Sequence, residues 1–222
     1  MKLRLLGLLL LIASGAFADI ADFTLYLDTE ISGSTPPAGS PAWVTATFQD
    51  ISEGVRLTIN ALNLTGGEFI SAFYFNFNPA KNLNLITSTP VGAGTQTQVN
   101  EIKFQDGNDQ KAGGFGWFDF EVDFPPPPGN APNKFTAGET FILDILGAGV
   151  TSTDFLNTSP EGLYALAHVQ GIETSGGTIS AWITGDTNRN PPLHVPEPTS
   201  VVLLGTTLIG LSYILRKRFA AR

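Results

Sequence analysis

Three acidic side chains at alternate positions are the first candidates for chemistry in this sequence. Asp119, Glu121 and Asp123 stand two residues apart, so on a strand their carboxylates share one face at a spacing of about 7 Å. Inverting glycosidases hold two carboxyl groups about 6.5–9.5 Å apart, and calcium prefers hard oxygen ligands of this kind. The spacing permits a glycoside hydrolase or a calcium site, although such a row of acids is more often a solvated strand face.

Tryptophan rings offer a second kind of chemistry. Trp117 shares the predicted polar face with Asp119 and Glu121, and Trp182 stands opposite the apolar face of its own predicted strand. Aromatic rings that are exposed beside carboxylates hold sugar rings by stacking and hydrogen bonding. Trp117 and Trp182 are therefore candidate glycan-binding residues. The alternative is that these rings and Trp43 cover the edge of the core or the second sheet.

Other catalytic signals are weak. The chain has no cysteine, which removes thiolate zinc sites and cysteine nucleophiles. It also has no Gly-x-Ser-x-Gly elbow and no Gly-x-Gly-x-x-Gly loop. His168 stands in a predicted strand without a second histidine and is expected to be structural. Asp186, Asn188, Asn190 and Glu197 imitate the ligand spacing of an EF-hand loop, but Pro191 stands where the loop requires glycine. We expect no enzyme, no cofactor and no metal site beyond the weak calcium possibility.

The elements that must position these residues are strands. Apolar and polar residues alternate in 54–62, 69–78 and 116–124, which is the period of a half-buried strand. In 69–78 the alternation places four side chains on one face: Phe69, Phe73, Phe75 and Phe77. In 116–124 it likewise places on one face Phe118, Phe120, Val122 and Phe124. Further predicted strands are 23–28, 42–49, 83–88, 98–104, 139–146, 163–170 and 178–183.

Glycine-rich turns separate these strands, and no segment of the central region has a helical period. The pattern predicts a single antiparallel β-sandwich, jelly-roll-like in its number of strands. The 16 phenylalanines suit the layer between two sheets. The prolines of 125–128 are expected to form a stiff loop.

The first residues form a predicted signal peptide. Two cations precede a short apolar run and the small-x-small end Ala16-Phe17-Ala18. Cleavage after Ala18 by signal peptidase leaves Asp19 as the first residue. The alternative, an uncleaved anchor, is disfavoured because the apolar run is well short of the ~20 residues that span a bilayer.

A second apolar segment lies near the C-terminus. Thr199–Leu215 is 17 residues without a charge, at the lower limit of ~17–25 residues for a transmembrane helix. Arg216, Lys217 and Arg218 follow it, and the positive-inside rule keeps such cations in the cytoplasm. The pattern predicts one C-terminal transmembrane helix with the preceding chain outside. The alternative, a buried core helix, does not usually end in three consecutive cations.

Val195-Pro196-Glu197-Pro198, the short span and the basic stop together resemble the C-terminal sorting signal of PEP-CTERM proteins. The resemblance covers about the last 28 residues. It implies export through the inner membrane of a Gram-negative bacterium, tethering by the span, and recognition and cleavage near the Pro-Glu-Pro motif by an exosortase. The prolines on either side of Glu197 keep the backbone extended and unpaired, as a processing enzyme requires.

These features divide the chain into a signal peptide (1–18), a β-domain (19–186), a flexible stalk (187–195) and the sorting signal (196–222). The mature region keeps six of the 12 basic and 19 of the 20 acidic residues, a charge near −13. This charge disfavours nucleic acid and anionic lipid as partners. We expect an exported structural or interaction protein of the cell surface or extracellular matrix. A module that binds exopolysaccharide is the alternative, and a glycoside hydrolase ranks third.

Overall fold

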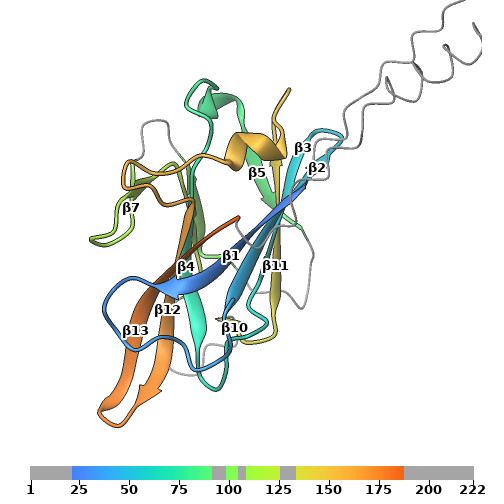
Figure 1. The fold of residues 1–222 in the computed structure, drawn as a ribbon. Coiled ribbons are helices and arrows are strands. Elements are labelled where there is room, and N and C mark those ends of the chain that lie inside the picture. Colours follow the sequence, from blue (N-terminus) through green and yellow to red (C-terminus); the bar gives the residue numbers. More distant parts are fainter. Residues whose placement is uncertain (1–21, 92–98, 105–108, 126–133, 188–222) are drawn as a thin grey trace, which may run out of the picture. The chain divides into compact units, whose positions relative to one another are not determined.

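The computed structural model describes residues 22–91, 99–104, 109–125 and 134–187 (Figure 1). All of these residues belong to one compact unit, Ile20–His194. The elements of this domain are β1 (Phe23–Glu30), β2 (Val44–Ile51), β3 (Gly54–Asn60), β4 (Phe69–Phe75), η1 (Leu83–Leu85), β5 (Thr87–Pro90), β6 (Glu101–Phe104), β7 (Gln110–Lys111), β8 (Trp117–Phe118), β9 (Phe120–Asp123), β10 (Phe135–Thr136), β11 (Thr140–Leu146), η2 (Ser152–Phe155), β12 (Ala165–Thr174) and β13 (Gly177–Asp186).

One antiparallel sheet contains most of these strands. Its order is β5-β11-β3-β2-β1-β13-β12-β4-β9-β6, and β10 pairs with β4. The strands β7 and β8 form a separate hairpin. Helical structure in the described residues is limited to the short turns η1 and η2. The all-β, antiparallel class predicted from the sequence is therefore confirmed.

The sheet curls until its walls face each other across the core. The strands β1, β13 and β12 separate β2 from β4, yet the rings of Phe48 and Phe75 are 5.6 Å apart. Phe124, directly after β9, and Phe141 of β11 come from near opposite ends of the sheet order, and their rings lie 5.2 Å apart. Instead of two separate sheets, one continuous and nearly barrel-shaped sheet encloses the core.

Alternation along the strands builds this core as expected. Phe23, Leu25 and Leu27 of β1 point inward, and the residues between them are half-buried. The strand β4 differs because all seven of its residues are buried. Its inner face packs in the barrel, and Ala72 and Tyr74 pack in a second apolar cluster on the outer side.

Two predicted faces are wrong at one residue each. The pairing of β4 with β12 skips Ser71, so this bulge turns Phe69, which stays buried, away from the main core cluster and puts Ile70 into it. At Asp119 the chain bends between β8 and β9, and Phe118 packs in the outer cluster instead of joining Phe120 in the core. In both places an irregularity interrupts the period of two on which the prediction relied.

The predicted strand 83–88 is only partly a strand. Leu83–Leu85 form the turn η1, where the Asn82 side chain accepts a hydrogen bond from the backbone N–H of Asn84. Extended structure begins afterwards, in β5. A local side-chain cap has taken the place of strand pairing here.

Both ends of the described chain leave the barrel at the same end. Tyr26 of β1 pairs with Asp186, the last residue of β13, and the strands are antiparallel. The beginning of β1 also pairs with the end of β2, so the β2–β3 turn lies at this end. We call it the proximal end. The β12–β13 hairpin lies at the opposite, distal end, at the bottom of Figure 1.

Candidate functional site

The predicted glycan-binding and acidic residues lie on or beside the outer face of β4, β12 and β13. Here an outer aromatic cluster is covered by the β7–β8 hairpin; its members are Ala72, Tyr74, Ala112, Phe118 and Leu166, with Ile31, Phe115, Leu163 and Trp182 at its edge. Gly113 (φ +57°) turns the hairpin directly above Trp182, since an added Cβ would lie 3.1 Å from the indole ring. The hairpin therefore needs glycine at this position.

Trp182 is half-buried in this cluster. Its ring stacks on His168 at 4.4 Å between centroids with an interplanar angle of 15°. Tyr74 and Phe115 lie at 5.9 and 5.7 Å. His168 covers one face of the indole. A sugar ring could therefore contact only the part of the indole that His168, Tyr74 and Phe115 do not cover.

Trp117 is the more accessible ring. It is 44% exposed, and Lys111 of the paired strand places its ammonium 5.3 Å from the ring centroid. Neighbouring residues of a strand point to opposite sides, so Trp117 points away from the cluster that Phe118 joins. The structure does not bring Trp117 and Trp182 into one platform. Trp43 is buried, and its indole N–H donates to the Gly39 carbonyl at 2.6 Å.

Each of the three candidate acids has a structural partner. The Asp119 carboxylate is buried and accepts the backbone N–H of Phe77 at 2.8 Å. Asp123 accepts the side-chain amide of Asn100 at 2.7 Å. Asp119 lies outside β9, and only Glu121 and Asp123 occupy the shared strand face that the sequence predicted. The described residues contain no group of three or more His, Cys, Asp or Glu side chains that could hold a metal ion.

Glu121 connects two neighbours through hydrogen bonds. It accepts the Tyr74 hydroxyl at 2.7 Å and the Lys103 ammonium at 3.0 Å. Burial and the bonded Glu121 carboxylate raise the pKa of Tyr74 far above its usual range, and the same carboxylate raises the pKa of Lys103. These hydrogen bonds connect β4, β9 and the edge strand β6. Tyr74 and Lys103 are the donors, and the Glu121 carboxylate is the acceptor.

His168 is held in the outer cluster by a second set of contacts. The Ser71 hydroxyl lies 2.9 Å from its Nδ1, and the Gln170 amide lies 3.5 Å from the same atom. Trp182 covers the ring. Burial lowers the pKa of His168. These contacts agree with the structural role expected from the sequence.

We expect His168 to make the domain less stable in acid. The unfolded chain binds the imidazole proton more tightly than the folded one. The contribution of neutral His168 to the stability is therefore complete above about pH 6.5 and decreases as the pH falls below that value. NMR titration should give a His168 pKa below that of an unfolded peptide. In His168→Phe, which keeps a ring against Trp182, unfolding measurements should show a smaller loss of stability between pH 7 and 5. An equal loss in both proteins would contradict this role.

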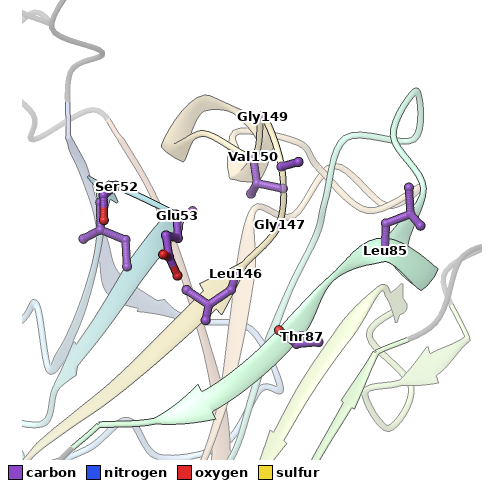
Figure 2. Close-up of a pocket in the computed structure, with 11 residues that line it drawn as sticks. Ser52, Glu53, Leu85, Thr87, Leu146, Gly147, Gly149 and Val150 are labelled. Carbon is purple, nitrogen blue, oxygen red and sulfur yellow. The ribbon is translucent and has the colours of Figure 1, made fainter.

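Two hollows in the surface had no signal in the sequence. The proximal hollow has a volume of about 620 Å³ and lies between the β2–β3 turn, η1 and the segment after β11 (Figure 2). The distal hollow, about 470 Å³, lies beside the β12–β13 hairpin. Gly171 (φ +79°) forms a bulge there, where an added Cβ would lie 2.3 Å from the Gly67 carbonyl oxygen. Lys134 lies 4.4 Å above the Phe69 ring in the same hollow.

The predicted processing sites lie outside the described residues. They are Ala16 and Ala18 of the signal peptide, the motif Val195, Pro196, Glu197 and Pro198, and the basic residues Arg216, Lys217 and Arg218. The predicted span 199–215 lies outside them too. Within 22–91, 99–104, 109–125 and 134–187, no helix is long and apolar enough to cross a membrane.

Comparison of the chain with models of protein families, with curated proteins and with solved structures finds no match.

Proposed function

We propose that this chain is an exported structural or interaction protein whose β-domain is carried to the cell surface or extracellular matrix of a Gram-negative bacterium. The signal peptide directs export, and the span 199–215 holds the chain in the inner membrane. An exosortase then cleaves near Pro196–Pro198. The single observation that carries this proposal is the order of the last segments: Pro-Glu-Pro, a short apolar span and three cations.

The fold supports this role. The first and last described residues both lie at the proximal end, so the distal hairpin is left away from both ends of the described chain. The barrel-like core contains no cysteine, and several of its phenylalanine rings stack on one another. Such a core folds without help from disulfide formation.

The proposal assigns no catalysis and no cofactor to the domain. A glycosidase needs one carboxylic acid to give up a proton and a second carboxylate to attack or to activate water. Asp119, Glu121 and Asp123 each accept hydrogen bonds from the protein instead. Calcium binding by these residues would compete with those contacts for the carboxylate oxygens.

Carbohydrate binding is the second candidate function, because the Trp117 ring is 44% exposed beside the Lys111 ammonium. A glycan array that includes bacterial exopolysaccharides tests it. Binding that is lost in Trp117→Ala would support this module. Trp182→Ala is the weaker test, since it also removes the stack on His168. Binding unchanged by both substitutions, or no binding, would exclude a tryptophan-based module.

Mass spectrometry of the processed protein tests the sorting proposal. The full chain is expressed in a bacterium that has an exosortase, and the C-terminus is expected near Pro196–Pro198. Glu197→Ala should leave the tail attached, because it removes the only charge of the motif. Glu173→Ala, an exposed acid of the distal hairpin, is the matched control and should be processed normally. An intact Arg222 in the unaltered chain would contradict the proposal.

A further inference from the structure

The distal hollow, about 470 Å³ in volume, lies where β4, β12 and β13 run side by side. This volume falls within the range of about 300–1,000 Å³ that ligand sites occupy. The strand register places Gln170 opposite Phe69 on one side and opposite Ser180 on the other. Nearer the hairpin turn, Glu173 stands opposite Thr178. Polar side chains of β12 and β13 therefore line the hollow in two cross-strand pairs.

A bulge and a buried carboxylate fix one wall of this hollow. Gly171 bulges from β12 toward the turn before β4, and an added Cβ there would lie 2.3 Å from the Gly67 carbonyl oxygen. The next residue, Glu68, is only 2% exposed. Its carboxylate accepts the backbone N–H groups of Thr65 at 2.8 Å and Ala38 at 2.7 Å. The turn is thus held in place before a ligand arrives, which lowers the cost of ordering the site on binding.

Two opposite charges line the hollow without pairing with each other. Neither Lys134 nor Glu173 takes part in the four ion pairs among the described residues. Lys134 lies 4.4 Å above the Phe69 ring, and Glu173 is exposed. A ligand with a net charge would be attracted by one of these groups and repelled by the other. A neutral ligand with hydroxyl groups can accept from the ammonium and donate to the carboxylate.

The other side chains of the hollow suit the same kind of ligand. In the described part of the chain, no hydrogen bond holds the hydroxyl groups of Thr178 and Ser180. The Gln170 amide lies 3.5 Å from Nδ1 of His168, so its carbonyl oxygen and second N–H can reach a ligand. Hydroxyl and amide groups both donate and accept, as neighbouring sugar hydroxyls do. Ile179, 36% exposed, adds apolar contact for the C–H groups of a sugar ring.

We propose that the distal hollow binds a neutral, hydroxyl-rich glycan. The Lys134 ammonium donates to one sugar hydroxyl, and the Glu173 carboxylate accepts from another. This inference rests on the proposed role as an interaction protein and names the chemical class of its partner. The site differs from the Trp117 ring, which belongs to the β7–β8 hairpin. The acidic excess of the mature region also favours a neutral over an acidic polysaccharide.

NMR titration of the exported and processed protein tests this site. The probes are hexasaccharides of three neutral glycans, dextran, cellulose and mannan, and of the acidic glycan alginate. A neutral hexasaccharide is expected to shift the amide signals of Gln170, Gly171 and Thr178 and to bind more tightly than alginate. Ser180→Tyr should weaken this binding at least about tenfold, because the larger side chain fills the hollow. Its thermal unfolding should stay nearly unchanged, since Ser180 is exposed.

Two further variants test the charged groups. Lys134→Gln and Glu173→Gln are each expected to weaken binding about threefold to tenfold, as the loss of one hydrogen bond does. Glu53→Gln, at an exposed acid of the proximal end, is the matched control and should bind like the unaltered protein. Tighter binding of alginate would overturn the neutral ligand. No binding of a neutral probe, or binding unchanged in Ser180→Tyr, would overturn the site. Neither result would touch export, which the C-terminus found by mass spectrometry tests separately.

Discussion

Replacing Phe75 by alanine is expected to lower the free energy of unfolding by about 3–5 kcal/mol. Phe75 is fully buried and its ring stacks on Phe120 of β9 at 4.6 Å. It also contacts Phe48 of β2 at 5.6 Å and Phe155 of η2 at 5.9 Å. The substitution removes the ring that joins both walls of the barrel and leaves a cavity between them.

Urea unfolding of the processed protein measures this loss. Leu62→Ala, at a side chain that is 61% exposed, is the matched control and should change the stability by less than about 0.5 kcal/mol. Equal effects of both substitutions would contradict a core in which Phe75 connects opposite walls. A variant that does not fold at all meets the prediction, and Phe75→Leu then provides the measurable, smaller loss.

Replacing Asp154 by alanine is expected to cost about 1–3 kcal/mol, the usual result of leaving buried hydrogen-bond donors without their acceptor. Asp154 is 4% exposed. It accepts hydrogen bonds from the Lys81 ammonium, the Asn78 amide and the Thr151 backbone N–H. The substitution leaves these donors without their acceptor at the start of η2.

Asp154 also gives the stability a dependence on acid. Burial alone would raise the pKa of Asp154, but the hydrogen bonds from Lys81, Thr151 and Asn78 outweigh it and lower the pKa. As the pH falls, the Asp154 carboxylate of the unfolded chain therefore takes up a proton before that of the folded chain. The contribution of ionised Asp154 to the stability is complete above about pH 4 and decreases below it. Unfolding measured from pH 6 to 3 should show a weaker dependence in Asp154→Asn.

Asp144→Ala is the control for this prediction. Asp144 pairs with Arg56 at 2.7 Å, and its side chain is 17% exposed, against 6% for the Asp154 side chain. Ion pairs whose cation is as exposed as Arg56, at 38%, contribute about 0–1 kcal/mol, so the loss should be smaller than at Asp154, which also accepts from Asn78 and Thr151. Equal losses at the two sites would contradict the buried network around η2.

Periodicity in the sequence predicted the strands whose two sides meet different surroundings. In β1 and β3 one face meets the core and the other is half-exposed. Apolar and polar residue types therefore alternate along these strands, and the alternation can be recognised in the sequence. The prediction from periodicity failed at Phe69 and Phe118. The bulge at Ser71 depends on its partner His168 and the bend at Asp119 on its partner Phe77, and both partners are distant in sequence.

The candidate site was predicted less well for the same reason. The sequence placed Trp182 opposite the apolar residues of its strand, but could not show that the β7–β8 hairpin folds over it. Nor could it show that Glu121 meets Tyr74 and Lys103, because strand order decides these neighbours. The proximal hollow likewise arises where the β2–β3 turn meets the segment after β11.

Export of the β-domain, with a membrane stop after it, is tested most directly by two fusions to alkaline phosphatase, which becomes active only where its disulfides can form. Fused after Val195, the enzyme is expected to be active, because this position lies outside the inner membrane. Fused after Arg222, it is expected to be inactive, because the cations of 216–218 remain in the cytoplasm. An inactive fusion after Val195 would contradict export of the domain, and with it a role at the cell surface.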